Sequence, residues 1–585
     1  MRRTKIVCTL GPACDDNSVL LEMVKEGLNV ARMNFSHGTH EEHLERINRI
    51  KNISNKTRKS IGIMLDTKGP EIRTGDFLEG SIELIADQQI VVTSREVIGD
   101  QKTIKVNYPN IAKDLKIGDV LLFDDGLIGV TVEEVQNESD LLCRINNSGV
   151  LKNKKGVNIP NVKLNLPSLT EKDIGDILFG IEQGIDFIAA SFIRRAEDVI
   201  GIRKILEENN AQSVQIISKI ENRQGVDNID EIIRVSDGIM VARGDLGVEI
   251  PAEEVPLAQK MMIHKCNEAG KPVITATQML DSMMRNPRPT RAEVSDVATA
   301  IFDGTDAIML SGETAAGKYP VESVKIMAGI AERIEASLNY DELFRSRYEC
   351  ADNTITNAIS LATCRTALSL KASAVITATA SGYTAVSVSK FRPEAPIIAA
   401  THTDSVMRRL SLSWGVFPVK TDKLDTTDSV IEHSVQRALS EKMIKTGDLV
   451  VVTAGVPVGV AGSTNLIKVH VVSELLYKKV GTGKKTVVGK ARIGTYYDDL
   501  KDVFEEGDIL VVPATDRDLV PLIEKAGAVV VEEGGLTSHA FIVCMNLGVE
   551  VVVGADNATK RIEQGEIITV NGSRGLVYKG EARIL

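Results

Sequence analysis

The sequence has little of what marks secreted, membrane-spanning and nucleic-acid-binding proteins. Its 585 residues contain seven scattered cysteines and no C-x-x-C pair, which argues against a disulfide framework and a structural zinc site. No stretch approaches the ~18 uncharged apolar residues that a spanning helix needs, and no apolar signal segment follows Met1. The net charge of −11 argues against nucleic acid as the main partner. We therefore expect a cytoplasmic protein with neither a nucleic-acid nor a membrane partner.

A recurring pattern of strand and helix signals predicts an α/β fold. A short apolar run is followed by a turn and then by a segment of helical period, and this happens eight times before residue 344. Alternating strands and helices imply a parallel sheet, and eight such units are the number in a closed (β/α)8 TIM barrel. The predicted strands are Lys5–Thr9, Val30–Asn34, Gly62–Asp66, Phe187–Ala190, Gln215–Ile220, Gly238–Ala242, 273–275 and Ala307–Leu310.

The rest of the sequence predicts three domains besides a catalytic barrel of residues 1–68 and 168–344. Residues 69–167 alternate short strands with turn signals, which is typical of an all-β module, and their position after the third barrel strand places them as a lid over the active-site face. Residues 345–473 predict an open α/β domain. Residues 474–585 predict an extra α/β domain, and the basic, glycine-containing stretch 478–485 indicates a linker near its start.

Polar side chains gather where the predicted barrel strands end. Residues just beyond the C-terminal ends of barrel strands face the active site, so these side chains form one candidate set. The set comprises Arg32, Asn34 and Ser36 after the second strand, Asp66 and Thr67 after the third, Lys219 and Glu221 after the fifth, Arg243, Gly244 and Asp245 after the sixth, and Thr277 after the seventh.

Three members of this set predict phosphoryl-transfer chemistry. Glu221 and Asp245 lie at adjacent strand ends and can hold one Mg²⁺ or Mn²⁺, because Mg²⁺ takes only one or two carboxylates and fills its other positions with water and substrate oxygens. Lys219 beside them suits a phosphoryl or enolate oxygen. The alternative is a belt of structural salt bridges on the barrel rim, which would not require every member to lie at a C-terminal strand end.

Several motifs add a resemblance to a known family. Ile216-Ile-Ser-Lys-Ile-Glu-Asn222, Met240-Val-Ala-Arg-Gly-Asp-Leu-Gly247 and Thr275-Ala-Thr-Gln-Met-Leu280 resemble the motifs of pyruvate kinase, in order and at the expected spacing. The resemblance extends over about residues 1–473 and includes the segments 9–12, 31–38, 65–75, 286–293 and 309–314.

The resemblance implies the last step of glycolysis, in which phosphoenolpyruvate and ADP give pyruvate and ATP. It implies that Glu221 and Asp245 bind Mg²⁺ and that Lys219 stabilises the transferring phosphoryl group. Arg32 would contact the substrate phosphate, and Gly244 and Thr277 would contact the substrate carboxylate. Thr277 would also help to deliver a proton to the enolate carbon.

The resemblance also implies further ligands and a homotetramer. A K⁺ ion would be bound by Asn34, Ser36, Asp66 and Thr67, and the nucleotide phosphates would meet Arg73 and Lys155. An acidic residue at position 71 accompanies K⁺ dependence in the family, and Glu71 occupies that position here.

A loop in the third domain is a candidate effector site. Residues 377–384 are rich in hydroxyl groups and glycine and lie between a strand and a helix, which suits a phosphate at a helix N-terminus. The loop resembles the effector loop of the family at Thr379, Ser381, Gly382 and Thr384. Position 380 is alanine where many members have a basic residue, so we expect a sugar or nucleotide monophosphate as an allosteric activator. The alternative is a plain loop with a helix cap.

The C-terminal segment resembles the phosphohistidine domain of phosphoenolpyruvate-utilising enzymes. Residues 533–543 carry the likeness, and His539 is the phosphorylated residue in those enzymes. No ATP-grasp domain is visible to charge it, which favours a structural or regulatory remnant. The alternative enzyme is a dikinase or phosphoenolpyruvate synthase relative that uses His539 as carrier. A third interpretation, a metabolite sensor on an inactive barrel, predicts missing catalytic groups, and none of the expected ones is missing.

Overall fold

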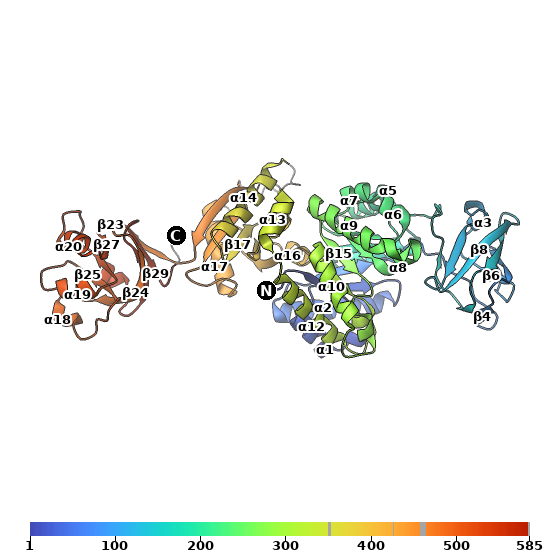
Figure 1. Ribbon diagram of the computed structural model, residues 1–585, viewed down its shortest axis with the longest axis horizontal. Helices are drawn as coiled ribbons and strands as arrows, with labels where there is room; N and C mark the ends of the chain where they lie inside the picture. Colours follow the sequence, from blue (N-terminus) through green and yellow to red (C-terminus); the bar gives the residue numbers. More distant parts are fainter. Residues whose placement is uncertain (349–352, 425, 457–463, 583–585) are drawn as a thin grey trace. The chain divides into compact units, whose positions relative to one another are not determined.

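The computed structural model describes residues 1–348, 353–424, 426–456 and 464–582 (Figure 1). The chain forms two compact units, each described below by itself. The first contains residues 1–353, 381–392 and 403–418, and the second contains residues 354–380, 393–402 and 419–585.

A closed parallel barrel forms the centre of the first unit and confirms the predicted fold class. Its strands follow one another in the order β1-β16-β15-β14-β13-β12-β3-β2, and every neighbouring pair is parallel. The strands are β1 (Lys5–Thr9), β2 (Val30–Asn34), β3 (Gly62–Asp66), β12 (Phe187–Ala190), β13 (Gln215–Ile220), β14 (Gly238–Ala242), β15 (Val273–Ala276) and β16 (Ala307–Leu310).

Helices surround the barrel, and several begin with the polar caps that the sequence provides. Thr39, Thr170 and Thr290 each accept a hydrogen bond from the backbone three residues on, where an acidic side chain returns the contact. The helices are α1 (Asn17–Glu26), α2 (His40–Thr57), α4 (Glu171–Glu182), α5 (Ala196–Glu208), α6 (Arg223–Asp227), α7 (Ile229–Val235), α8 (Arg243–Glu249), α9 (Val255–Ala269), α10 (Arg291–Asp303), α11 (Gly312–Ala315), α12 (Pro320–Glu335) and α13 (Tyr340–Tyr348), with short 3-10 turns at Pro12–Cys14, Ala252–Glu254 and Asp281–Met284.

The barrel interior is filled by side chains and is a core. Met64, Phe187, Ile217 and Met240 pack there, and Leu412 from the segment 403–418 joins the same cluster. The segment 403–418 also covers Lys5, whose ammonium nitrogen donates to the carbonyl oxygen of Val416 at 2.6 Å and lies 4.5 Å from the ring centre of Phe417. Burial, aided by the charge of Arg2, lowers the pKa of Lys5 to about 7.

Lys5 makes the stability of the fold pH-dependent. Between the folded pKa of about 7 and the ordinary value of 10.5 the unfolded chain binds more protons than the folded chain, so this residue makes stability rise with pH across that window. A Lys5→Met variant lacks this rise. We expect its unfolding temperature, relative to the natural protein, to fall steadily between about pH 7 and pH 9. A difference that is constant over that range in thermal unfolding scans would contradict the lowered pKa.

The insertion after β3 forms an all-β module with a core of its own. Six strands lie in the order β11-β7-β8-β9-β5-β6, and β10 pairs with β4 in a second sheet. Phe123, Val130 and Leu141 are among its fully buried side chains. The elements are β4 (Ser81–Leu84), β5 (Gln89–Thr93), β6 (Thr103–Lys105), α3 (Ile111–Asp114), β7 (Val120–Phe123), β8 (Ile128–Val135), β9 (Asp140–Ile145), β10 (Gly149–Lys152) and β11 (Val157–Asn158). We call residues 69–167 the lid.

A five-stranded sheet in the order β19-β18-β17-β20-β21 follows in sequence, as predicted for an open α/β domain. β17, β18 and β20 are parallel, and β21 runs antiparallel to β20. The elements are α14 (Ile355–Ser369), β17 (Ala374–Ala378), α15 (Tyr383–Ser389), β18 (Ile397–Thr401), α16 (Asp404–Leu410), β19 (Val416–Lys420), α17 (Thr427–Ser440), β20 (Leu449–Gly455) and β21 (Thr464–Val471).

The C-terminal segment folds around an eight-stranded mixed sheet in the order β22-β29-β28-β24-β25-β26-β27-β23. The elements are β22 (Leu475–Lys478), β23 (Val480–Thr482), β24 (Thr486–Ile493), α18 (Tyr497–Leu500), β25 (Ile509–Val512), α19 (Val520–Lys525), β26 (Ala528–Val531), α20 (His539–Leu547), β27 (Glu550–Val553), α21 (Ala558–Arg561), β28 (Ile567–Asn571) and β29 (Leu576–Lys579).

The predicted linker at 478–485 is wrong. This stretch contains β23, which pairs antiparallel with β27. Gly481 permits the pairing because a Cβ atom there would lie 2.7 Å from the carbonyl oxygen of Val551 in β27, and 2.5 Å from that of Gly572. The glycine therefore marks a close approach of backbones, a use of glycine in strands that resembles a linker signal in the sequence.

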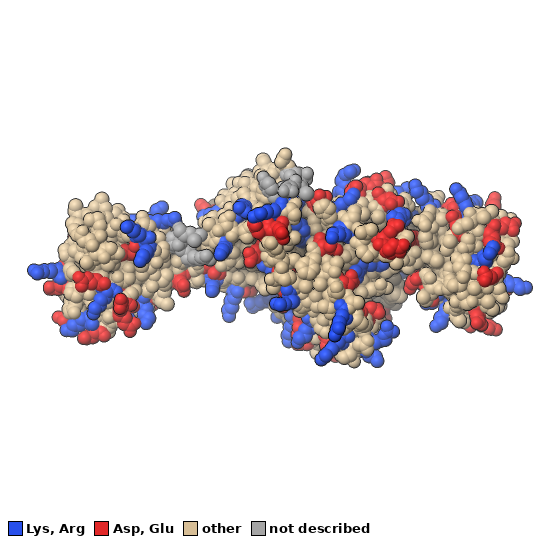
Figure 2. All heavy atoms as spheres, in the orientation of Figure 1, with Lys and Arg blue, Asp and Glu red and all other residues tan. Residues whose placement is uncertain are grey.

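The distribution of charged side chains and the character of the helices are consistent with a sequence that has charges of both signs and no long apolar run. Basic and acidic side chains are intermixed on the face shown in Figure 2. Of the helices in the described ranges, none has both the length and the apolar character needed to cross a membrane.

Candidate active site

Lys219 is the centre of a buried polar cluster at the C-terminal end of the barrel. It lies near the end of β13, and its side chain is only 11% exposed. Its ammonium nitrogen lies 2.8 Å from Glu221 Oε1, 3.2 Å from Asp66 Oδ1 and 2.8 Å from Ser191 Oγ. Burial alone would lower the pKa of Lys219, but the charges of Asp66 and Glu221 outweigh it and raise that pKa. Lys219 is therefore a fixed positive charge.

Arg32 lies beside Lys219, and both side chains donate to the same carboxylate, Asp66. Its Nε donates to Asp66 Oδ2 at 2.7 Å, and its Nη1 donates to Thr9 Oγ1 at 2.7 Å. Burial alone would raise the pKa of Asp66, but Arg32 and Lys219 outweigh it and hold that pKa below its usual value. Asp66 thus orients two cations. The Lys219 ammonium already has three partners, so an anionic substrate would replace one of them, whereas Arg32 has guanidinium N–H groups beyond those bound to Asp66 and Thr9.

Glu221 and Asp245 form the carboxylate pair that the sequence predicts. Glu221 follows β13, and Asp245 lies in the first turn of α8, directly after the neighbouring strand β14. Burial raises the pKa of Glu221, and the charge of Asp245 raises it further. Burial likewise raises the pKa of Asp245, with contributions from Asp125, Asp66 and Glu71. The surroundings therefore favour the binding of a further positive charge.

The donor set fits a divalent ion that completes its coordination with substrate oxygens. Within the described part of the chain, no three or more His, Cys, Asp or Glu side chains group as a complete metal site. Glu221 is buried and Asp245 is partly exposed at adjacent strand ends. Such a pair matches Mg²⁺, which usually retains water or substrate ligands. Glu221 and Asp245 are the residues that could hold it.

Thr277 has a strained backbone next to the carboxylate pair. Its φ of 68° is in the left-handed region, which a β-branched residue rarely adopts. The Gly244 N–H donates to Thr277 Oγ1 at 2.7 Å, and Arg243 Nη2 donates to the Thr277 carbonyl oxygen at 2.8 Å. The Thr277 hydroxyl in turn donates to the Ala276 carbonyl oxygen at 2.6 Å. These contacts hold a hydroxyl and a backbone N–H together, and a substrate carboxylate would bind the pair by replacing their present acceptors.

The four residues predicted for K⁺ come from two adjacent strands. Asn34 and Asp66 are register partners across β2 and β3. The Ser36 N–H donates to Asn34 Oδ1 at 3.1 Å, and the Thr67 carbonyl oxygen accepts from Ser191 Oγ at 2.6 Å. All four residues offer oxygen donors, so the set fits a hard cation.

Arg73 and Lys155 do not join the buried cluster. Both belong to the lid and pair with lid carboxylates. Arg73 Nε donates to Glu71 Oε2 at 2.8 Å, and Lys155 Nζ lies 2.8 Å from Asp124 Oδ1. Each side chain is 35% exposed, so both can exchange these partners for an anion.

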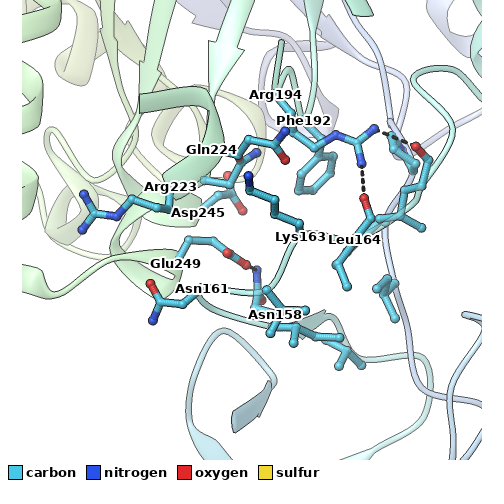
Figure 3. A pocket seen from close by; sticks show the side chains of 18 of the residues that line it. Asn158, Asn161, Lys163, Leu164, Phe192, Arg194, Arg223, Gln224, Asp245 and Glu249 are labelled. Atoms are coloured by element: carbon cyan, nitrogen blue, oxygen red, sulfur yellow. Dashed lines mark hydrogen bonds between the residues drawn. The ribbon is translucent and has the colours of Figure 1, made fainter. Parts of the chain in front are cut away.

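A cavity of about 310 Å³ lies between the lid and the barrel (Figure 3). Asp245 and Phe192 line it on the barrel side, and Asn158, Asn161 and Lys163 line it on the lid side. Of the carboxylate pair, Asp245 lines the cavity and Glu221 does not, and neither do Lys219 and Arg32. The cavity therefore lies beside the buried cluster and touches it at Asp245.

Sequence reasoning missed residues at two strand ends. Ser191 follows β12, accepts from Lys219 and donates to Thr67, and the Phe192 N–H donates to Glu221 Oε2 at 2.5 Å. Thr9 ends β1 and binds Arg32. The rule that identified Asp66 would have found Ser191 and Thr9 if it had been applied to all eight strands.

The two remaining candidate sites lie outside the barrel. Thr379 follows β17, and Ser381, Gly382 and Thr384 surround the start of α15, where Gly382 has a φ of 90°. His539 is the exposed first residue of α20, and its Nδ1 lies 2.9 Å from Thr515 Oγ1. Among the described residues, Nε2 of His539 has no hydrogen-bond partner, and the residue is exposed to solvent.

A closed parallel barrel with this cluster at the C-terminal ends of its strands defines a barrel enzyme. Three family descriptions match the chain: "Pyruvate kinase, barrel domain" over residues 1–324, "Pyruvate kinase, alpha/beta domain" over 357–470 and "PEP-utilising enzyme, mobile domain" over 504–575. Pyruvate kinases of Geobacillus stearothermophilus and Bacillus licheniformis are each 54% identical to it, and both alignments cover 100% of each chain.

A solved structure agrees with these matches. A crystal structure of a pyruvate kinase from Cryptosporidium parvum superimposes with a TM-score of 0.77 at 40% identity, covering 80% of this chain and 96% of that one. The chain therefore belongs to the pyruvate kinase family, and it is a phosphotransferase. The predicted resemblance, including the additional C-terminal domain, is confirmed.

Proposed function

We propose that the buried cluster around Lys219 transfers the phosphoryl group of phosphoenolpyruvate to ADP, giving pyruvate and ATP. The observation that carries this proposal is Lys219 held between Asp66 and Glu221, next to Arg32, at the C-terminal end of the barrel. The test is an assay of ADP-dependent pyruvate formation from phosphoenolpyruvate. Absence of pyruvate under saturating Mg²⁺ and K⁺ would refute the proposal.

The chain's own groups bind and orient both ends of the substrate. Arg32 and Lys219 are fixed cations, and we assign them to the phosphoryl group, whose charge in transfer is stabilised by positioned donors. The Gly244 N–H and the Thr277 hydroxyl bind the carboxylate. We also assign to the Thr277 hydroxyl the transfer of a proton, through water, to the enolate carbon. Arg73 and Lys155 meet the nucleotide phosphates.

Mg²⁺ or Mn²⁺, bound by Glu221 and Asp245, would supply Lewis-acid stabilisation of the substrate oxygens. The raised pKa values of these two carboxyl groups support the assignment, because a bound cation offsets the cost of burying both charges together.

K⁺ at Asn34, Ser36, Asp66 and Thr67 makes the reaction dependent on a monovalent cation. Glu71 supports this dependence through the family resemblance, in which an acidic residue at this position accompanies K⁺ dependence. Replacing K⁺ by tetramethylammonium at constant ionic strength should lower kcat/KM by at least about tenfold. An unchanged rate in the same coupled assay would refute the K⁺ site.

The loop at Thr379, Ser381, Gly382 and Thr384 is our proposed site for a phosphorylated activator, a sugar or nucleotide monophosphate. The left-handed Gly382 and the hydroxyl side chains around it support the proposal. Titration of the enzyme with such compounds at subsaturating phosphoenolpyruvate tests it. Unchanged rates with every compound would argue against it.

Three further features complete the proposal. The enzyme is a cytoplasmic homotetramer, and its domains divide at residues 68/69, 167/168, 344/345 and 473/474. The separate sheets support this division.

His539 is a structural or regulatory remnant, because the barrel has its own nucleotide contacts. Phosphoenolpyruvate labelled at phosphorus should leave no label on His539, and stable labelling would favour a carrier role.

A further inference from the structure

The loop of residues 191–195 connects β12 to α5, and its residues 191–194 contact both the catalytic cluster and the lid. It is short, and Phe192 within it has a φ of 55°, a left-handed conformation that a bulky residue rarely adopts. Such strain persists only where surrounding contacts hold it in place. The strained conformation at Phe192 must therefore be held by the contacts of residues 191–194.

The first half of the loop positions Lys219 and Glu221. Ser191 Oγ accepts from Lys219 Nζ at 2.8 Å and donates to the Thr67 carbonyl oxygen at 2.6 Å. The Phe192 N–H donates to Glu221 Oε2 at 2.5 Å. A shift of this backbone would therefore move the hydrogen-bond partners of both catalytic-site residues together.

The second half of the loop holds the returning connection of the lid. Arg194 is 9% exposed, and its guanidinium donates to the carbonyl oxygens of Leu166 at 2.9 Å, Pro167 at 3.2 Å and Leu164 at 3.4 Å. Figure 3 shows the Arg194 side chain reaching from the barrel to this segment. Asn228 Nδ2 donates to the Arg194 carbonyl oxygen at 2.8 Å and anchors its backbone to the barrel.

The outgoing connection of the lid contacts the same loop. Gly69 has a φ of 73°, and a Cβ atom there would lie 2.7 Å from the Phe192 ring and 3.0 Å from Ser191 Cβ. Both chain segments that carry the lid therefore lie against residues 191–194. A rotation of the lid about these two connections would therefore change their contacts with residues 191–194.

We propose that Arg194 is a positioning residue that couples the lid to Lys219 and Glu221 through residues 191–194. The inference rests on the proposed function only for its effect on catalysis. Arg194 transmits the position of the 164–167 connection to the Phe192 backbone, so the lid's orientation and that of Glu221 change together. A guanidinium is suited to this role, because its planar fork binds several carbonyl oxygens in one fixed geometry and an ammonium does not.

Arg194→Ala and Arg194→Lys test the coupling, and Arg195→Ala is the matched control. Arg195 is the next residue, is 54% exposed and pairs with Glu197 and Asp198 of α5. Asp198 also lies 3.7 Å from Arg194 Nε, so Arg195→Ala controls for the loss of a positive charge beside Asp198 while the contacts to the lid stay. Two experiments are made. Steady-state kinetics of pyruvate formation give kcat and KM, and hydrogen exchange of the substrate-free protein is followed in peptides covering residues 187–195. Arg194→Ala should lower kcat by at least about tenfold with a smaller change in KM. Hydrogen exchange at the Phe192 amide should become faster in Arg194→Ala. Both kcat and the exchange rate of Arg194→Lys should lie between those of the natural protein and of Arg194→Ala.

Three results would overturn the proposal. One is an Arg194→Ala kcat within about twofold of the natural enzyme, the value expected of Arg195→Ala. The second is a lower kcat with unchanged exchange in residues 187–195. If Arg194→Ala does not fold, a fully active Arg194→Lys with natural exchange is the third. A natural enzyme that forms no pyruvate would refute the proposed function instead, and the exchange comparison would still test the coupling.

Discussion

Lys219→Met should lower kcat by about 10²–10³-fold, the loss typical of removing one preorganised donor from a developing negative charge. Phosphoenolpyruvate binding should survive, because Arg32, the Gly244 N–H and Thr277 remain. Methionine matches lysine in length and fills the same buried space. The measurement is steady-state kinetics of pyruvate formation together with titration of phosphoenolpyruvate binding.

The Lys219→Met variant removes the positive charge that pairs with Asp66 and Glu221, so its folding must be checked separately. Asp66 retains its contact with Arg32 at 2.7 Å. Lys271→Met is the control, because Lys271 donates to the carbonyl oxygens of Ile233 and Ser236 and has no contact with the cluster among the described residues. Its kcat should stay within about twofold of the natural value. A Lys219→Met enzyme with near-natural kcat would remove Lys219 from the reaction.

Glu221→Gln should lower kcat strongly and raise the Mg²⁺ concentration needed for half-maximal activity by at least about tenfold. The amide oxygen can still accept from the Phe192 N–H, so the local backbone is preserved while the charge is lost. Activity measured across a Mg²⁺ titration, with Mn²⁺ in parallel, provides the comparison.

Asp245→Asn makes this test more specific. If both carboxylates hold the same ion, the double variant should cost little more than either single change, because residues that act as a unit are strongly non-additive. Independent, additive losses or an unaltered Mg²⁺ requirement would show that Glu221 and Asp245 do not share a metal.

Much of the barrel could be predicted because local pattern and global fold agree there. The strand period predicts β13 over Gln215–Ile220, and parallel strands that close into a barrel must bring Lys219, Asp66 and Arg32 to one end. The same rule, applied to every strand, would also have included Ser191. The buried cluster is thus a consequence of strand order and of polar residues at strand ends.

Other features could not be predicted from local pattern because they depend on long-range backbone contacts. Gly481 has the composition of a linker residue, yet it lies where two backbones approach closely in a sheet. Arg194 has no motif of its own, and its role follows from carbonyl oxygens of residues 164–167 that approach it only in the folded chain. Side-chain contacts to backbone carbonyls leave no periodic signal in the sequence.

The most direct test of the central claim is a transfer experiment with phosphoenolpyruvate labelled at phosphorus, ADP, Mg²⁺ and K⁺. It compares the natural enzyme with the Lys219→Met and Glu221→Gln variants. The natural enzyme should place the label in ATP in equal amount with pyruvate formed, and both variants should lose transfer in parallel. Pyruvate formed without labelled ATP, or labelled ATP made at the natural rate by either variant, would contradict phosphoryl transfer at this site.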